Sequence, residues 1–241
     1  MEIADAQARA LLDLLRSLEL EEWELVTDCD PWTVKDSVAH VLAWAEATIS
    51  PRELVHQFSK AFGDRGSHDG VLLHAQNALQ VKERAHLTPA ELLAKLGSAL
   101  PRFNKARRRL RYPMKLVPYK DSFSGDWITL GVIAETTYTR DHFMHRLDIL
   151  RATGRDAARV PSDATIVADV VREWTTRTKA DVRLELSGPS GGAFVSGNGG
   201  AGTIRADAFD MMRRVAGRPG ELTIEGDHAR IEDWLQTLAT F

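Results

Sequence analysis

Residues 31–40 read Pro-Trp-Thr-Val-Lys-Asp-Ser-Val-Ala-His, and residues 141–148 read Asp-His-Phe-Met-His-Arg-Leu-Asp. In the second stretch, Asp141 and His145 are four residues apart and Asp148 follows three residues later, so on a helix the three side chains share one face. The first stretch places His40 on an earlier predicted helix. Two imidazoles and a carboxylate on facing helices form the donor set of a divalent-metal site with an open coordination position. The two stretches therefore predict facing helices that carry a metal site.

Helix-start signals surround the first stretch and recur along the first 150 or so residues. Thr33 is a good N-cap, and Asp36 at the third position after it resembles a capping box. Thr88, followed by Pro89 and by Glu91 three residues after the cap, marks a clearer start. The first part of the chain is therefore predicted to be helical.

Helix-stop signals are also present. Pro101 is expected to kink or end the helix that begins after Thr88. A long helix is expected from about Leu130 to Ala152, and Gly154 is placed to stop it. This long helix contains residues 141–148.

The composition changes after residue 154. Residues 155–162 are small and polar and include Pro161, which indicates a linker. Glycine-rich turns are expected at 188–192 and 197–200. Further helices are expected over 164–178, over 208–215 and after a cap at Asp227, with strands at 182–186, 203–205 and 222–225. The predicted fold class is α plus α+β, with a helical bundle over residues 1–154 and a small α+β domain over residues 163–241.

The composition excludes several classes of protein. The chain has 241 residues, of which 44% are hydrophobic and 27% are charged, as in ordinary globular proteins. The net charge of −3 gives no general attraction to nucleic acid. A single cysteine, Cys29, fits a reducing compartment. With no long apolar run and no signal-peptide pattern at the start, we expect no membrane partner and a cytoplasmic location.

Simpler interpretations of the candidate ligands remain open at this point. Asp141 and His145 can form an i,i+4 pair on a helix surface, and His40 can be a hydrogen-bonded histidine of the core. The basic run at residues 105–111 can be a phosphate or nucleic-acid patch, but a solvated helix end is the favoured interpretation.

The order of the motifs resembles a known family. Residues 32–34 (Trp-Thr-Val) and 38–40 (Val-Ala-His), with Cys29 just before them, resemble the N-terminal signature of the mycothiol-dependent maleylpyruvate isomerase family. That family belongs to the DinB-like metal-binding four-helix bundles. Its second signature, Glu-x-x-x-His-x-x-Asp, is similar to residues 141–148, with Asp141 in place of glutamate. Residues 216–218 (Ala-Gly-Arg) and 222–227 look like the end of the family's sterol-carrier-protein-like C-terminal domain.

The resemblance implies a role for each matching residue. His40, Asp141 and His145 would bind the metal, and Asp148 would brace a ligand or an N-terminal contact. Arg218 would hold an anionic substrate or an enolate-like intermediate. Because aspartate is one methylene shorter than glutamate, Asp141 would need closer helices or a bridging water, and weakened metal binding is the alternative.

The resemblance also implies an activity. The chain would use a divalent metal, either zinc or alternatively nickel or iron, and mycothiol or a similar low-molecular-weight thiol. The metal would lower the pKa of the thiol, and the thiolate would attack a small electrophilic substrate, giving an isomerase or an S-transferase. The alternatives are a non-catalytic small-molecule-binding homologue and a metal-dependent hydrolase that uses metal-bound water.

Overall fold

The computed structural model describes residues 2–120, 125, 127–156 and 160–241. The chain divides into two compact units, residues 1–155 and 156–241. Within the predicted linker, residues 157–159 lie outside the described residues. None of the described helices combines the length and apolar character needed to cross a bilayer.

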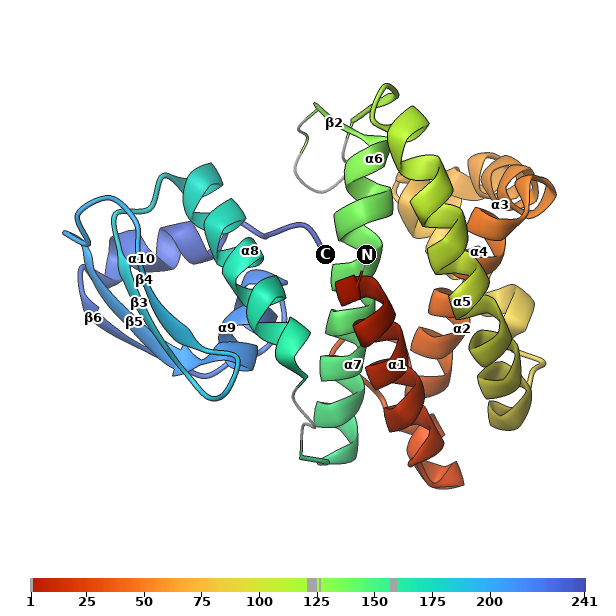
Figure 1. Cartoon of the computed structure of the whole chain (residues 1–241), viewed down its shortest axis with the longest axis horizontal. Coiled ribbons are helices and arrows are strands. Elements are labelled where there is room, and N and C mark those ends of the chain that lie inside the picture. Colours follow the sequence, from red (N-terminus) through yellow and green to blue (C-terminus); the bar gives the residue numbers. More distant parts are fainter. Residues whose placement is uncertain (1, 121–124, 126, 157–159) are drawn as a thin grey trace. The chain divides into compact units, whose positions relative to one another are not determined.

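The first unit is helical, and among its described residues two short strands, β1 and β2, pair antiparallel. Its elements are α1 (Glu2–Arg16), η1 (Leu20–Glu24), α2 (Val34–Ile49), α3 (Pro51–Asp64), η2 (Arg65–Ser67), α4 (Leu72–Arg84), α5 (Pro89–Met114), β1 (Pro118–Lys120), β2 (Trp127–Thr129), α6 (Leu130–Val132), η3 (Ile133–Thr137) and α7 (Tyr138–Thr153). Helices α1, α2, α5 and α7 pack into a four-helix bundle, and the α3–α4 pair packs against α2 (Figure 1).

The core of the bundle comes from apolar stripes on these helices. Leu11 and Leu15 of α1, Leu42 of α2 and Leu96 and Leu100 of α5 are almost fully buried and pack in one cluster. Leu11 and Leu15, and likewise Leu96 and Leu100, are four residues apart, which puts each pair on one helix face. The bundle therefore fixes the separation of α2 and α7, which carry the two quoted stretches.

The predicted helix starts are confirmed by their capping contacts. The Thr33 hydroxyl accepts a hydrogen bond from the Asp36 amide, and the Asp36 carboxylate accepts one from the Thr33 amide. Thr88 and Glu91 make the same reciprocal pair at the start of α5. At the end of α7, Gly154 has a φ of 63°, the left-handed conformation that suits glycine.

Two predictions about helix ends need correction. Of the two outcomes expected at Pro101, a kink or an end of the helix, the end is wrong, because α5 continues through Pro101 to Met114. The neighbouring Leu100 and Phe103 are buried, and their packing offsets the hydrogen bond that proline cannot donate. The predicted helix from 130 to 152 is interrupted by a π-helical turn, η3 (Ile133–Thr137), between α6 and α7.

The second unit is an α+β domain. It contains α8 (Pro161–Thr178), β3 (Arg183–Ser187), β4 (Gly192–Val195), β5 (Gly202–Asp207), α9 (Ala208–Val215), β6 (Leu222–Gly226) and α10 (His228–Leu235). The strand order is β4-β3-β5-β6; β3 and β5 are parallel, and the outer pairs are antiparallel. Strand β4 was missed because its glycine-rich start was assigned to a turn. The predicted fold class, a helical bundle followed by a small α+β region, is confirmed.

Candidate metal centre

The structure brings His40, Asp141 and His145 together inside the bundle. His40 lies on α2, and Asp141 and His145 lie one turn apart on α7. The nitrogen and oxygen atoms that they offer as ligands all lie within 4.8 Å of one another. The side chains of both histidines are 5% exposed and that of Asp141 is 19% exposed. A solvated Asp141–His145 surface pair does not fit these exposures.

The distances in this cluster suit a bound cation better than hydrogen bonds. Two atoms that each lie 2.0–2.2 Å from zinc at the tetrahedral angle are about 3.4 Å apart. Asp141 Oδ1 lies 3.4 Å from His145 Nε2 and 3.6 Å from His40 Nε2. Both separations exceed the roughly 2.7–3.2 Å of an N–H···O hydrogen bond. The shorter carboxylate of Asp141 therefore reaches the point where the two imidazoles converge.

Charge also concentrates in this cluster. Burial opposes ionisation of Asp141, but His145 and His40 outweigh it and hold the pKa of Asp141 well below its usual range. Burial likewise opposes a charge on His145, but Asp141 and then Asp148 raise the pKa of His145 to about 10. Burial lowers the pKa of His40 despite the neighbouring Asp141. Without metal, the cluster thus holds an anionic carboxylate, a cationic His145 and a neutral His40.

Asp148 and an aromatic wall surround the cluster. Asp148 is fully buried, and its Oδ2 lies 3.6 Å from Nδ1 of His145, on the side of the ring opposite Asp141. A carboxylate in this place can orient a metal-binding imidazole. The Trp32 ring is centred 4.8 Å from His40 and 6.0 Å from His145, and it stacks on His145. Trp44 meets His40 edge-on at 6.5 Å. Trp32 therefore contacts both imidazoles, and Trp44 contacts that of His40.

Cys29 lies close to the same site, which spacing alone did not indicate. Among the described residues, Cys29, His145 and Asp148 form a second group whose ligand atoms lie within 4.8 Å of one another. Because a thiolate is also a zinc ligand, this group competes with the first for His145. The local sequence around Cys29 does not indicate a metal ligand, because the distance from Cys29 to His145 depends on how the whole bundle packs.

The interpretation of residues 105–111 as a solvated helix end is wrong for Arg107. Arg107 is fully buried, and it donates hydrogen bonds to the Ala134 carbonyl at 2.6 Å, to the Glu135 carbonyl at 3.3 Å and to Thr139 Oγ1 at 2.6 Å. Burial lowers the pKa of Arg107 to about 10, so it stays cationic at neutral pH. It therefore supplies donors to the π-helical turn that leads to Asp141.

A periodic signal for Arg107 was present in the sequence. Leu96, Leu100 and Phe103 precede it at spacings of four and three residues, and all three are buried. Arg107 follows Phe103 by four residues and so continues the apolar stripe.

His142 is a second buried residue that the sequence did not single out. It lies beside Phe103 with ring centroids 5.7 Å apart, and burial lowers the pKa of His142 to about 3.

Arg218 belongs to the second unit. It follows α9 and is half-buried, with its amide donating to the Arg213 carbonyl and its Nη1 donating to the Ala216 carbonyl. Its role toward a substrate stays a prediction.

Comparison with known proteins agrees with this architecture. Two crystal structures are similar: the mycothiol-dependent maleylpyruvate isomerase, with a TM-score of 0.59, and its histidine-to-alanine mutant, with a TM-score of 0.58. Each is 16% identical in sequence, and each alignment covers 93% of this chain and 90% of the other. A search of curated proteins finds no match. Residues 4–150 match the family described as mycothiol maleylpyruvate isomerase N-terminal domain. The chain therefore belongs to the mycothiol maleylpyruvate isomerase N-terminal domain family.

Proposed function

We propose that this protein is a metal-dependent, thiol-dependent isomerase or S-transferase that acts on a small, electrophilic, anionic substrate. The observation that carries the proposal is the convergence of His40, Asp141 and His145 in a buried cluster with metal-like spacing. Family membership supports mycothiol, or a similar low-molecular-weight thiol, as the cofactor. The donor set of two imidazoles and one carboxylate suits zinc, with nickel or iron as alternatives.

Each candidate residue would have a separate task. His40, Asp141 and His145 would hold the ion, and Asp148 would keep the His145 ring in place. A bound divalent metal lowers the pKa of a coordinated thiol and so supplies a thiolate near neutral pH. Trp32 and Trp44 would limit the access of water, which strengthens electrostatic interactions inside the site. Arg218 would bind the anionic group of the substrate.

The fate of the adduct between thiol and substrate distinguishes an isomerase from an S-transferase. Addition of a thiolate to a conjugated double bond, rotation about the resulting single bond and expulsion of the thiolate give cis–trans isomerisation with the thiol returned. Addition followed by protonation, without expulsion, gives a stable S-conjugate. Both reactions need a thiol in the assay, and only the first leaves its concentration unchanged.

An assay with and without thiol tests the proposal against its alternatives. Zinc-loaded protein should turn over maleylpyruvate or a related unsaturated acid only when mycothiol or a similar thiol is added. Turnover without any thiol would favour a hydrolase. Substrate binding without turnover, whatever thiol is present, would favour the non-catalytic homologue, to which the aspartate at position 141 gives some support.

Zinc uptake should release about one proton per ion near pH 7.5. The proton comes from His145, whose pKa of about 10 keeps it charged in the metal-free protein, whereas zinc binds only neutral imidazole. Asp141 and His40 have lowered pKa values and are already deprotonated. The apparent zinc affinity should therefore rise about tenfold per pH unit up to about pH 10.

Calorimetric titration in two buffers with different heats of protonation measures this release directly. The difference between the two observed enthalpies should correspond to about one proton taken up by the buffer. Equal enthalpies in both buffers would contradict a protonated His145 in the metal-free site.

A further inference from the structure

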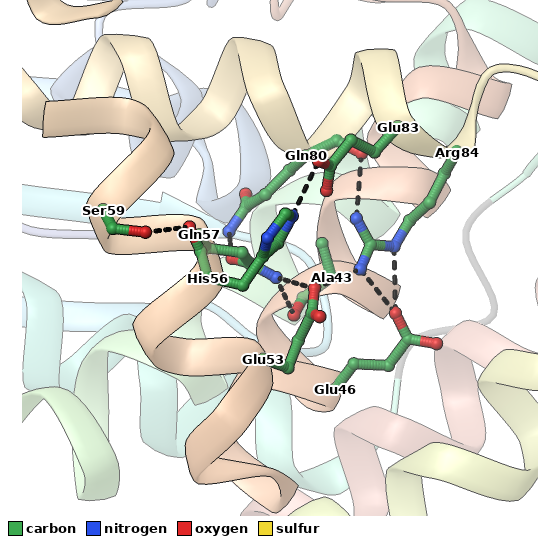
Figure 2. A network of polar contacts seen from close by, with 9 residues as sticks. All are labelled: Ala43, Glu46, Glu53, His56, Gln57, Ser59, Gln80, Glu83 and Arg84. Carbon is green, nitrogen blue, oxygen red and sulfur yellow. Dashed lines mark hydrogen bonds and ion pairs between the residues drawn. The ribbon is translucent and has the colours of Figure 1, made fainter. Parts of the chain in front are cut away.

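A network of hydrogen bonds and ion pairs joins polar side chains of α2, α3 and α4 (Figure 2). Its innermost members are two fully buried glutamines, Gln57 of α3 and Gln80 of α4, which we call the amide pair. Gln80 Nε2 donates to Gln57 Oε1 at 2.8 Å. Gln57 Nε2 donates to the Ala43 carbonyl at 3.1 Å and to Glu53 Oε1 at 2.9 Å. The amide pair thus connects three helices.

The outer end of the network is held by charge. Arg84 Nη2 donates to Glu53 Oε1 at 3.1 Å, and Arg84 Nε donates to Glu46 Oε2 at 3.0 Å. Arg84 Nη1 also donates to the carbonyl of Gln80 at 3.2 Å. Glu53 is therefore fixed in place by a cation, and it can only accept a hydrogen bond from Gln57 because its pKa is lowered and it is ionised.

The chemistry of donors and acceptors determines how both amides are turned. Neither the Ala43 carbonyl nor the Glu53 carboxylate can donate, so the Gln57 atom that faces them must be the NH₂ group. Gln57 Oε1 then faces Gln80 and can only accept, so the Gln80 atom that faces it must also be an NH₂ group. This orientation leaves Gln80 Oε1 as an acceptor directed away from Gln57.

Two complementary atoms remain at the inner end. Gln80 Oε1 and His40 Nδ1 are both buried, and neither has a hydrogen-bond partner among the described residues. The amide pair reaches the carbonyl of Ala43, which lies one turn after His40 on α2, so the network brings the Gln80 amide to this part of α2. Since His40 Nε2 faces Asp141, the ring nitrogen left to meet Gln80 is Nδ1.

We propose that Gln80 is a positioning residue of the metal centre: its Oε1 accepts a hydrogen bond from Nδ1–H of His40 and thereby presents the lone pair of Nε2 to the ion. This inference rests on the proposed function, because it assigns the ion to Nε2 of His40. A partner on the second nitrogen fixes both the tautomer and the ring orientation of a metal-binding histidine. Neutral amides achieve this on His40, whereas Asp148 faces the corresponding nitrogen of His145. Because the Gln80 amide carries no charge, Asp141 remains the anionic group next to His40. Asp141 also faces His145.

The test compares Gln80→Met with Gln76→Met. Methionine is close to glutamine in length and flexibility but lacks the amide acceptor. Gln76 lies one turn earlier on α4 and is 1% exposed, so it is a matched control for the loss of a buried amide. We expect Gln80→Met to weaken zinc binding by about 10–100-fold, as for the loss of other outer partners of metal ligands, and Gln76→Met to bind zinc as the wild type does.

A second readout does not depend on metal, and its wild-type half does not depend on the folding of a variant. In metal-free wild-type protein above neutral pH, ¹H–¹⁵N correlation spectra should show His40 with its proton on Nδ1. In Gln80→Met, the proton should move toward Nε2, where Asp141 can accept it. A wild-type His40 protonated on Nε2, or a folded Gln80→Met that binds zinc as tightly as the wild type, would overturn the inference.

The two readouts separate this inference from the proposed function. A wild-type chain whose Nδ1 tautomer depends on Gln80 but which binds no zinc would overturn the metal centre, and with it the positioning role. A wild-type chain that binds zinc with no dependence on Gln80 would overturn the positioning role alone.

Discussion

A His145→Ala variant is expected to lose zinc binding and thiol-dependent turnover together. His145 supplies one of the two imidazoles of the cluster, and its Nε2 lies 3.4 Å from Asp141. Loss of an outer partner of a ligand costs about 10–100-fold in metal affinity, so loss of a ligand itself should cost more than about 100-fold. Zinc content after dialysis and turnover in the presence of thiol measure the two effects.

The matched control for this variant is His74→Ala. His74 lies exposed on α4 and belongs to neither cluster of potential ligands. It should keep both zinc and activity. Circular dichroism should show that both variants keep their helix content. Full zinc content in a folded His145→Ala protein would contradict the proposed ligand set.

An Arg107→Met variant is expected to lose about 3–5 kcal/mol of stability. The guanidinium donates to the Ala134 and Glu135 carbonyls and to Thr139 Oγ1. The Glu135 carbonyl keeps a hydrogen bond from Thr139 Oγ1, but the Ala134 carbonyl and Thr139 Oγ1 each lose a buried charged donor, at about 1–3 kcal/mol each, and methionine replaces only the packing of the side chain. Because these acceptors lie in and just after the π-helical turn that precedes Asp141, zinc affinity should fall as well. Urea denaturation of the metal-free protein measures the loss of stability.

Arg108→Met is the neighbouring control. Arg108 is partly exposed and pairs with Asp5 at 3.0 Å, with side-chain exposures of 43% and 34%. Such surface pairs contribute about 0–1 kcal/mol, so this variant should unfold close to the wild type. Equal unfolding midpoints for Arg107→Met and Arg108→Met would show that the buried hydrogen bonds of Arg107 do not stabilise the bundle.

Features that depend on neighbouring residues were predictable from the sequence. The caps at Thr33 and Thr88 involve partners three residues away, and Gly154 stops α7 through its own backbone conformation. Strand β3 was also predictable from its local pattern, because the buried Leu184 and Leu186 alternate with exposed residues. In each case, the contacts that decide the structure lie within one turn or one strand.

Features that depend on distant contacts were not predictable in the same way. The π-helical turn is bound by Arg107, about 28 residues earlier in the chain. The continuation of α5 through Pro101 depends on the burial of Leu100 and Phe103 in the bundle. Strand β4 exists because it pairs with β3. The local sequence contains none of these partners.

The candidate site shows the same division. The spacing of Asp141, His145 and Asp148 placed them on one helix face, but spacing alone left a surface pair open. Only the packing of α2 against α7 brings His40 to within 3.6 Å of Asp141. The approach of Cys29 to His145, and of Gln80 to His40, depends on the same long-range packing.

The most direct test of the metal centre is X-ray absorption spectroscopy at the zinc edge, on wild-type protein loaded with zinc in the absence of thiol. Coordination by His40, Asp141 and His145 predicts a shell of nitrogen and oxygen atoms at about 2.0–2.2 Å, with the multiple scattering typical of two imidazoles. A sulfur atom at about 2.3 Å would assign the ion to Cys29 with His145 and Asp148. That result, or failure to bind zinc, would contradict the proposed centre.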